Sequence, residues 1–208
     1  MEISEEQARK NAENLFIWKD GNHKQAMLRL IVILMATILK STEREFNEDL
    51  NKIDNFRLCT DVSRVKKGIS PQNLNFDLRQ LNAGQYCAAY HFHRYAEELF
   101  MIISGSATLR TTNGLEIVQS GDLIFFEKGE SGAHQLYNHT TEPCTYLDIR
   151  TYIGHDICEY PDSNKLFIVP TYEIFKKDSQ VAYFDGEENV QEKWDKFEDS
   201  ANKKTEKD

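Results

Sequence analysis

Positive charge is scarce in this sequence. Its 208 residues include 25 lysines and arginines against 34 aspartates and glutamates, which gives a net charge of -9. Binding to nucleic acid or to an anionic membrane surface needs clustered Lys and Arg, and no basic recognition helix is evident near the N-terminus. We therefore expect neither partner. The length is typical of one domain with extensions, large enough to bury a core.

Cysteine is also sparse, and it is dispersed. The four residues Cys59, Cys87, Cys144 and Cys158 contain no Cys-x-x-Cys pair, which argues against a zinc ribbon or a redox dithiol. Reduced thiols in a cytoplasmic protein are the simplest interpretation. We interpret Cys87 as a small buried core residue rather than a nucleophile or a ligand.

No hydrophobic run is long enough to span a membrane. The most apolar stretch, Ala26 to Leu39, would form a helix about 21 Å long, against a hydrocarbon core of about 30 Å. An acidic segment precedes it and no A-x-A site follows, so a signal peptide is possible only if translation starts at Met27. We interpret the stretch as a helix buried under the domain or in an oligomer contact, with an interfacial membrane helix as the less favoured alternative.

The N-terminal quarter of the chain is expected to be helical. Ser4 to Phe16 starts with a capping serine and two glutamates, and apolar residues follow at helical spacing. Ser41 to Ile53 places three large apolar residues on one face of an amphipathic helix. We predict a helical N-terminal extension over residues 1–56.

Beyond the extension the pattern changes to that of strands. From Asn73 apolar residues alternate with polar ones, and Asn113-Gly114 is a strong hairpin signal. Short segments of this kind recur without a helical crossover, so we predict an antiparallel barrel over residues 57–153.

The C-terminal quarter carries weaker signals. Residues 154–190 are expected to form strands and loops packed on the barrel, and 191–208 a charged tail. Within that tail, Trp194 and Phe197 indicate a short helix, and the chain from Ser200 onward is expected to be disordered.

The chemistry of the sequence is concentrated in one segment. His91 and His93 stand two residues apart on an expected strand, so their side chains point to the same face and can share one metal. A carboxylate follows at Glu98, and His134 lies a hairpin away. Three imidazoles and a carboxylate suit iron, manganese, nickel, zinc or cobalt, and affinity order does not choose among them. We predict one divalent transition metal of unspecified identity.

These residues resemble the first of two motifs of the cupin superfamily, a group of small β-barrels. That motif reads Gly, five residues, His-x-His, three or four residues, Glu, six residues, Gly. Here it begins at Gly84, one residue farther from His91 than the pattern, and continues through Glu98 to Gly105. Glu97 fits the shorter spacing but leaves seven residues before Gly105, so Glu98 is the preferred ligand.

The second cupin motif reads Gly, five residues, Pro-x-Gly, two residues, His, three residues, Asn. It begins here at Gly121, has Glu127 in place of proline, and brings His134 two residues late. The closing spacing to Asn138 is correct, and Asn138 is expected to stabilise a turn or a strand end rather than bind metal.

The resemblance implies a mainly β fold. We expect a single cupin barrel, also called a double-stranded β-helix or jelly roll, with an α-helical N-terminal extension. The metal ligands that it implies are His91, His93, Glu98 and His134.

Strand parity extends the prediction to the barrel interior, which should be a largely apolar pocket around the metal. Tyr146, Asp148 and Arg150 alternate on one strand, and parity alone does not tell whether they face inward. The residues predicted to line the pocket are Cys87, Phe100, Ile102, Leu136, Tyr146 and Asp148.

The resemblance implies two types of reaction on a small organic molecule, dioxygenation and isomerisation. The alternative is a non-catalytic cupin that binds a sugar or a carboxylate. A third hypothesis is a structural cupin without metal, and the presence of all four ligand types argues against it. The segments 160–165 and 183–187 look similar to the C-terminal part of small bacterial cupins without an assigned reaction, and we interpret them as loops over the barrel rim rather than a substrate lid.

Cupin barrels commonly pair through an edge strand or an added segment. We therefore expect a homodimer with Ala26 to Leu39 in the contact. A chain without that stretch should be monomeric, and a truncated dimer would refute this role.

Overall fold

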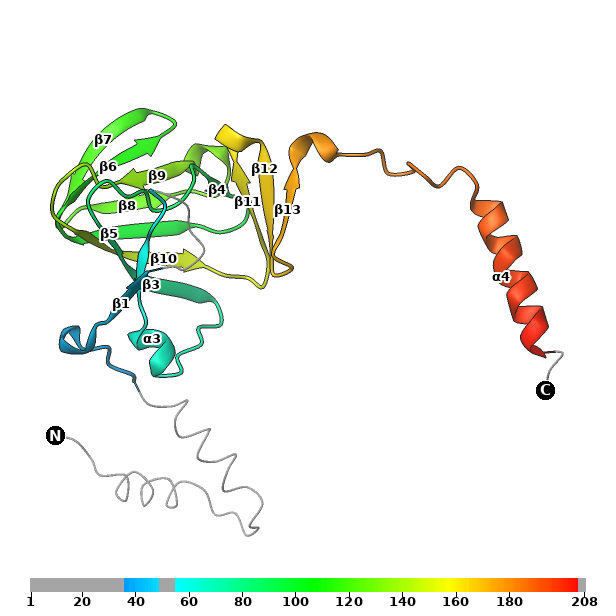
Figure 1. Cartoon of the computed structure of the whole chain (residues 1–208), viewed down its shortest axis with the longest axis horizontal. Helices are drawn as coiled ribbons and strands as arrows, with labels where there is room; N and C mark the ends of the chain where they lie inside the picture. Colours follow the sequence, from blue (N-terminus) through cyan, green and yellow to red (C-terminus); the bar gives the residue numbers. More distant parts are fainter. Residues whose placement is uncertain (1–35, 49–54, 206–208) are drawn as a thin grey trace, which may run out of the picture. The chain divides into compact units, whose positions relative to one another are not determined.

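A computed structural model describes residues 36–48 and 55–205 (Figure 1), with side chains described as far as residue 197. The chain divides into two compact units, Met1–Arg44 and Glu45–Asp208. In the first unit the described part contains one 3-10 turn, η2 (Ser41–Glu43). The helix predicted for Ser4 to Phe16 and most of the apolar stretch lie outside the described residues, so the helical extension stays unconfirmed.

The helix predicted from Ser41 to Ile53 is wrong over its described part. After η2 the chain extends into strand β1 (Phe46–Glu48), which pairs antiparallel with β2 (Cys59–Asp61). The backbone of Val62 also donates a hydrogen bond to the carbonyl of Glu45. An apolar residue every three or four positions suits a helix, but pairing with β2 outweighs this local preference.

The largest sheet has six antiparallel strands in the order β1-β2-β3-β10-β5-β8. The short helix α3 (Ser63–Lys66) connects β2 to the third strand. The other four strands are β3 (Leu74–Leu81), β5 (Glu98–Ser104), β8 (Leu123–Phe126) and β10 (Cys144–Thr151).

Two smaller sheets complete the domain, in the orders β13-β12-β11-β4 and β7-β6-β9. Isolated bridges at Tyr86↔Tyr137 and His91↔His134 add pairing to the third sheet. The predicted mainly β architecture is confirmed. The strands are β4 (Phe92–His93), β6 (Ser106–Thr111), β7 (Gly114–Gln119), β9 (His134–Tyr137), β11 (Asp156–Tyr160), β12 (Lys165–Val169) and β13 (Glu173–Lys176), and the 3-10 turns are η3 (Glu130–Gly132), η4 (Pro161–Ser163) and η5 (Lys177–Ser179).

Strand β10 shows which of its residues face inward. Tyr146 and Asp148 are buried, and the ring of Tyr146 lies 4.9 Å from that of Phe100. Directly opposite partners in an antiparallel pair share a face, and Arg150 is paired with Glu98. Tyr146, Asp148 and Arg150 therefore point into the barrel.

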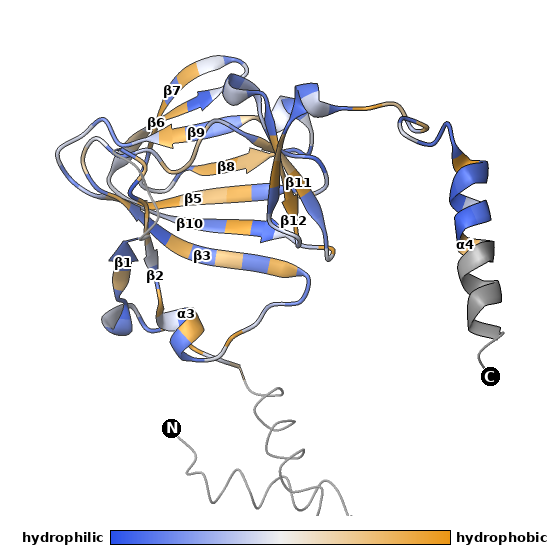
Figure 2. Cartoon of the chain, turned by 45° about the vertical axis from the view of Figure 1, so that its right-hand side comes forward, coloured by the Kyte–Doolittle hydropathy of each residue, from blue (hydrophilic) through white to orange (hydrophobic). Residues whose placement is uncertain are grey.

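The outer face of strands β5 and β8 is apolar and partly exposed. Met101 and Leu123 are paired across β5 and β8, as are Leu99 and Phe125. The exposed fractions of Leu123 and Phe125 are 65% and 56%. Figure 2 shows the hydrophobic colouring of β5 and β8.

The tail differs from its prediction. Helix α4 runs over Val190–Thr205, past Ser200, where disorder was expected. The segment holds no glycine or proline, and Gln191 hydrogen-bonds Asp195 one turn later, which favours a longer helix. Trp194 and Phe197 are both exposed. In the described residues, no helix is long and apolar enough to cross a membrane.

Candidate metal centre

Three of the predicted ligands, His91, Glu98 and His134, form one group, and the fourth, His93, contacts the carboxylate of that group. Glu98 is the first residue of β5, and its Oε2 lies 3.1 Å from His134 Nε2 and 3.3 Å from His93 Nε2. The ligand atoms of His91, Glu98 and His134 all lie within 4.8 Å of one another. The His91↔His134 bridge and the pairing of Glu98 with Phe126 hold these segments together.

Each of the three histidines is tethered through its Nδ1. His91 Nδ1 lies 2.9 Å from the carbonyl of Ala89, and His134 Nδ1 lies 2.9 Å from the carbonyl of Gly132. His93 Nδ1 lies 2.5 Å from Asp156 Oδ2. A carbonyl oxygen only accepts, so His91 and His134 carry their proton on Nδ1 and leave Nε2 as a lone pair when neutral. Tethering of this kind orients metal-binding histidines.

Two buried atoms of the cluster lack a hydrogen bond. They are Glu98 Oε2 and His134 Nε2, which lie within reach of each other but are not aligned for one. Both side chains are nearly inaccessible to solvent. A carboxylate oxygen opposite an imidazole lone pair is unfavourable when buried, and a cation between them would satisfy both. The residues therefore fit a bound metal.

The protonation states of His91 and Glu98 agree with this fit. Burial, followed by the neighbouring His134 and His93, lowers the pKa of His91 to about 3, so its imidazole is neutral. Burial alone would raise the pKa of Glu98, but the imidazoles of His134 and His93 hold that pKa well below its ordinary value. Glu98 is therefore ionised. A neutral imidazole and a carboxylate are the forms that bind metals.

His93 differs from the other two histidines because it lies between two carboxylates. Burial disfavours its charged form, yet the contacts with Asp156, Cys158 and Glu98 raise the pKa of His93 to about 11, so a metal that binds Nε2 must displace a proton from it. Cys158 Sγ lies 3.3 Å from His93 Nδ1. His93, Asp156 and Cys158 form a second buried group of metal-ligand type.

The structure also places the remaining motif residues. Glu97 is exposed and only Glu98 reaches the histidines, in agreement with the preferred spacing. Asn138 is fully buried, donates to the carbonyls of Leu81 and Glu142, and accepts two hydrogen bonds from Thr140. These hydrogen bonds join the segment after β9 to the end of β3, which supports the role at a turn or a strand end that the sequence predicts.

Three motif glycines occupy left-handed backbone. Gly84, Gly105 and Gly121 all have positive φ. At Gly105 a Cβ would lie 2.5 Å from the carbonyl oxygen of Pro143, so both backbone conformation and close packing require glycine there.

Aromatic rings enclose one side of the centre. The ring of Phe126 stacks on His134 with centroids 3.7 Å apart, and Phe100 is perpendicular to the same imidazole with centroids 5.3 Å apart. Tyr160 stacks on His91 at 5.7 Å. Phe126 and Tyr160 were not predicted, although Phe126 could have been found from its place opposite Glu98 once the register of β8 was known.

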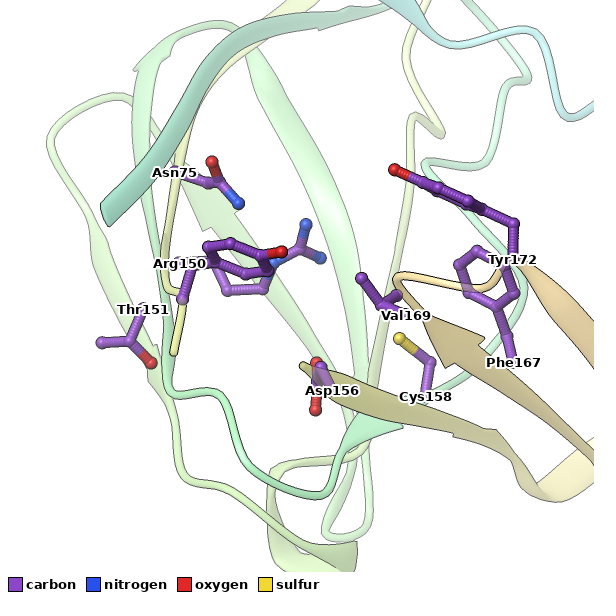
Figure 3. Close-up of a pocket in the computed structure, with 9 residues that line it drawn as sticks. Asn75, Arg150, Thr151, Asp156, Cys158, Phe167, Val169 and Tyr172 are labelled. Atoms are coloured by element: carbon purple, nitrogen blue, oxygen red, sulfur yellow. The ribbon is translucent and has the colours of Figure 1, made fainter. Parts of the chain in front are cut away.

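A cavity of about 340 Å³ adjoins the residues that contact His93. Figure 3 shows its lining side chains. Arg150, Asp156 and Cys158 belong to its wall and also contact His93. Its remaining lining residues are Asn75, Thr151, Tyr152, Phe167, Val169 and Tyr172.

The predicted pocket residues do not line this cavity. The structure packs them inside the barrel, where no exposed fraction exceeds that of Asp148, 8%. The physical reason is that the rings of Phe100 and Tyr146 fill the interior that parity alone leaves open. The residues concerned are Cys87, Phe100, Ile102, Leu136, Tyr146 and Asp148.

Comparison with known proteins agrees with the fold. Residues 78–150 match the family model described as the cupin domain. A crystal structure from Acidithiobacillus ferrooxidans, whose name suggests a sugar phosphate isomerase, is 20% identical, with a TM-score of 0.61 over 70% of this chain and 95% of its own. A structure from Silicibacter pomeroyi, named a sugar phosphate isomerase from a cupin superfamily, is 20% identical, with a TM-score of 0.59 over 72% of this chain and 98% of its own. No curated protein sequence matches the chain.

At this level of identity the two structures show the fold alone. The matched family model covers residues 78–150, and the two structures share the fold of this chain.

Proposed function

We propose that this cupin holds one divalent transition metal through Nε2 of its three clustered histidines and the carboxylate of Glu98, and acts as an enzyme on a small organic molecule. The observation that carries the proposal is the convergence of tethered imidazoles on Glu98, where two buried polar atoms lack hydrogen bonds. Measurement of the metal content of the purified protein tests the proposal, and near-stoichiometric metal would support it.

His91, His93, Glu98 and His134 would hold the metal, which would supply Lewis acidity and room for a small ligand. The protein residues fix its surroundings. The carbonyls of Ala89 and Gly132 keep the Nδ1 protons of His91 and His134 in place. Phe126 and Phe100 cover His134 and exclude water from that side.

Two reaction types remain open. The names of the two structurally similar proteins support isomerisation, and the donor set suits dioxygenation equally well. Two measurements distinguish these reactions. Dioxygenation consumes oxygen. Isomerisation consumes none and exchanges a substrate C–H proton with solvent deuterium without a change in oxidation state. The natural substrate would be sought by incubating the protein with metabolite mixtures.

The second candidate is a non-catalytic cupin that binds a sugar or a carboxylate in the same cavity. The charged lining residue Arg150 favours a carboxylate in that case. A protein that binds metal and ligand but gives neither oxygen uptake nor proton exchange would support this candidate. Cytoplasmic location and a homodimer stay predictions.

A further inference from the structure

An arginine lines the cavity and, among the described residues, has no carboxylate within ion-pair distance, although its charge partly offsets the rise that burial causes in the pKa of the nearby Asp148. This residue, Arg150, is partly buried. Its guanidinium contacts His93 Nε2 at 3.4 Å. The other partly buried or exposed arginines of unit Glu45–Asp208 each pair with a carboxylate; they are Arg57, Arg64, Arg79, Arg94 and Arg110.

The absence of an ion pair at Arg150 matters because a guanidinium keeps its charge at all physiological pH values. Withdrawing a charge from water is unfavourable unless a partner compensates it. The planar fork of an arginine matches a carboxylate or a phosphate, which it binds through two parallel hydrogen bonds. An oxyanion in the cavity would be such a partner for Arg150.

The acidic lining residue Asp156 does not prevent an oxyanion from binding to Arg150. Asp156 accepts hydrogen bonds from the backbone of Tyr95 and Ile157 and contacts His93 Nδ1. Its charge is thereby engaged away from the guanidinium. Asn75, which is paired with Arg150 across β3 and β10, adds an amide donor to the same side of the cavity.

The opposite side of the cavity is apolar. Figure 3 places Asn75, Arg150 and Thr151 on one side and Phe167, Val169 and Tyr172 on the other. The rings of Phe167 and Tyr172 lie 5.9 Å apart. The volume of about 340 Å³ is in the range that small organic ligands occupy.

We propose that this cavity holds an organic acid, with an oxyanionic head group on Arg150 and an apolar body against Phe167, Val169 and Tyr172. The inference rests on the proposed function, because it names the class of molecule held beside the metal centre. Contact of Arg150 and Asp156 with His93 places the occupant next to that centre.

Binding of four probes to the full-length, metal-loaded protein tests this proposal by ligand-observed NMR titration. Benzoate combines a carboxylate with an apolar ring, benzamide is its neutral counterpart, phenyl phosphate carries the other oxyanion, and acetate lacks the ring. We expect an oxyanionic probe to bind and benzamide to bind at least about tenfold more weakly. Binding of phenyl phosphate in place of benzoate identifies the head group as phosphate.

The variants separate the two sides of the cavity. Arg150→Gln should weaken binding of the oxyanion at least about tenfold. Arg110→Gln, at an exposed arginine paired with Asp162, should not weaken it. Tyr172→Ala, at a 72% exposed side chain that can change without unfolding the protein, should weaken benzoate or phenyl phosphate but not acetate. Equal binding to wild type and Arg150→Gln, or benzamide binding as tightly as benzoate, would overturn the proposal.

Metal content, measured on the same samples, separates the two claims. Loss of oxyanion binding in Arg150→Gln with no metal in any protein would support the cavity assignment and refute the proposed function. Full metal content together with oxyanion binding that does not depend on Arg150 would support the metal site and refute the cavity assignment.

Discussion

His134 Nε2 and Glu98 Oε2 lie 3.1 Å apart in the buried centre, and neither forms a hydrogen bond. Because both atoms lack a partner, a cation between them should stabilise the fold. At a metal concentration about 100 times its dissociation constant, binding contributes about 2.7 kcal/mol.

The first prediction is therefore a metal-dependent rise in thermal stability. Loading the metal-free protein should raise the unfolding midpoint by about 5–10 °C, measured by calorimetry. His134→Ala should abolish most of the rise. His139→Ala, at an exposed histidine that contacts Thr108, is the matched control and should behave as wild type. An equal rise in both variants would place the metal elsewhere.

The second prediction concerns the two adjacent glutamates. Glu98→Gln should lose most of the bound metal because the amide carries no charge at the point where the imidazoles converge. Glu97→Gln should keep it, since that side chain is exposed. Elemental analysis of both proteins checks this, and metal loss in the Glu97 variant would mean that the carboxylate is misassigned.

The third prediction treats Asp156 as a positioning residue. Burial would raise its pKa, but the contact with His93 holds the pKa of Asp156 below its ordinary value, so it is ionised. Asp156→Asn should weaken metal binding by about 10- to 100-fold, because His93 loses its oriented partner. Competition with a chelator measures the affinity. Asp162→Asn, whose side chain pairs with Arg110 at the surface, should change little.

The fourth prediction concerns Gly132, whose carbonyl orients His134. A Cβ at this position would lie 1.8 Å from the carbonyl oxygen of Glu127, so the loop must move. Gly132→Ala should lower the free energy of unfolding by about 1–3 kcal/mol and weaken metal binding. Ser131→Ala, next to it and exposed, is the control for denaturant unfolding. Unchanged stability of the glycine variant would contradict the packing.

The fifth prediction separates a structural motif residue from the ligands. Asn138→Ala should cost about 2–4 kcal/mol of stability, since buried backbone groups lose their partners. Its folded fraction should still hold metal. Asn47→Ala, at an exposed site in β1, should leave stability unchanged. Selective metal loss without destabilisation in the Asn138 variant would show that it is a ligand.

The local spacing of the motifs was sufficient to predict the mainly β fold and the proximity of His93 and His134 to Glu98. His91 and His93 share a face because strand side chains alternate, and the chosen glutamate is the buried one. These predictions depend on period and spacing, which the sequence carries directly.

The partners of His93 could not be predicted in the same way. Asp156 and Cys158 alternate on β11, but their role depends on the pairing of β11 with β4, more than 60 residues away in sequence. The cavity depends on the same pairing. The strand at Phe46 was missed because long-range pairing with β2 decided its conformation.

The most direct test is the metal content of protein purified without an affinity tag, beside a His91→Ala, His134→Ala double variant. The proposed centre predicts close to one metal per chain in the wild type and very little in the variant. Iron or manganese would direct assays to oxygen consumption, and zinc or nickel to isomerisation. No metal in either protein after reconstitution, or equal metal in both, would contradict the proposed centre.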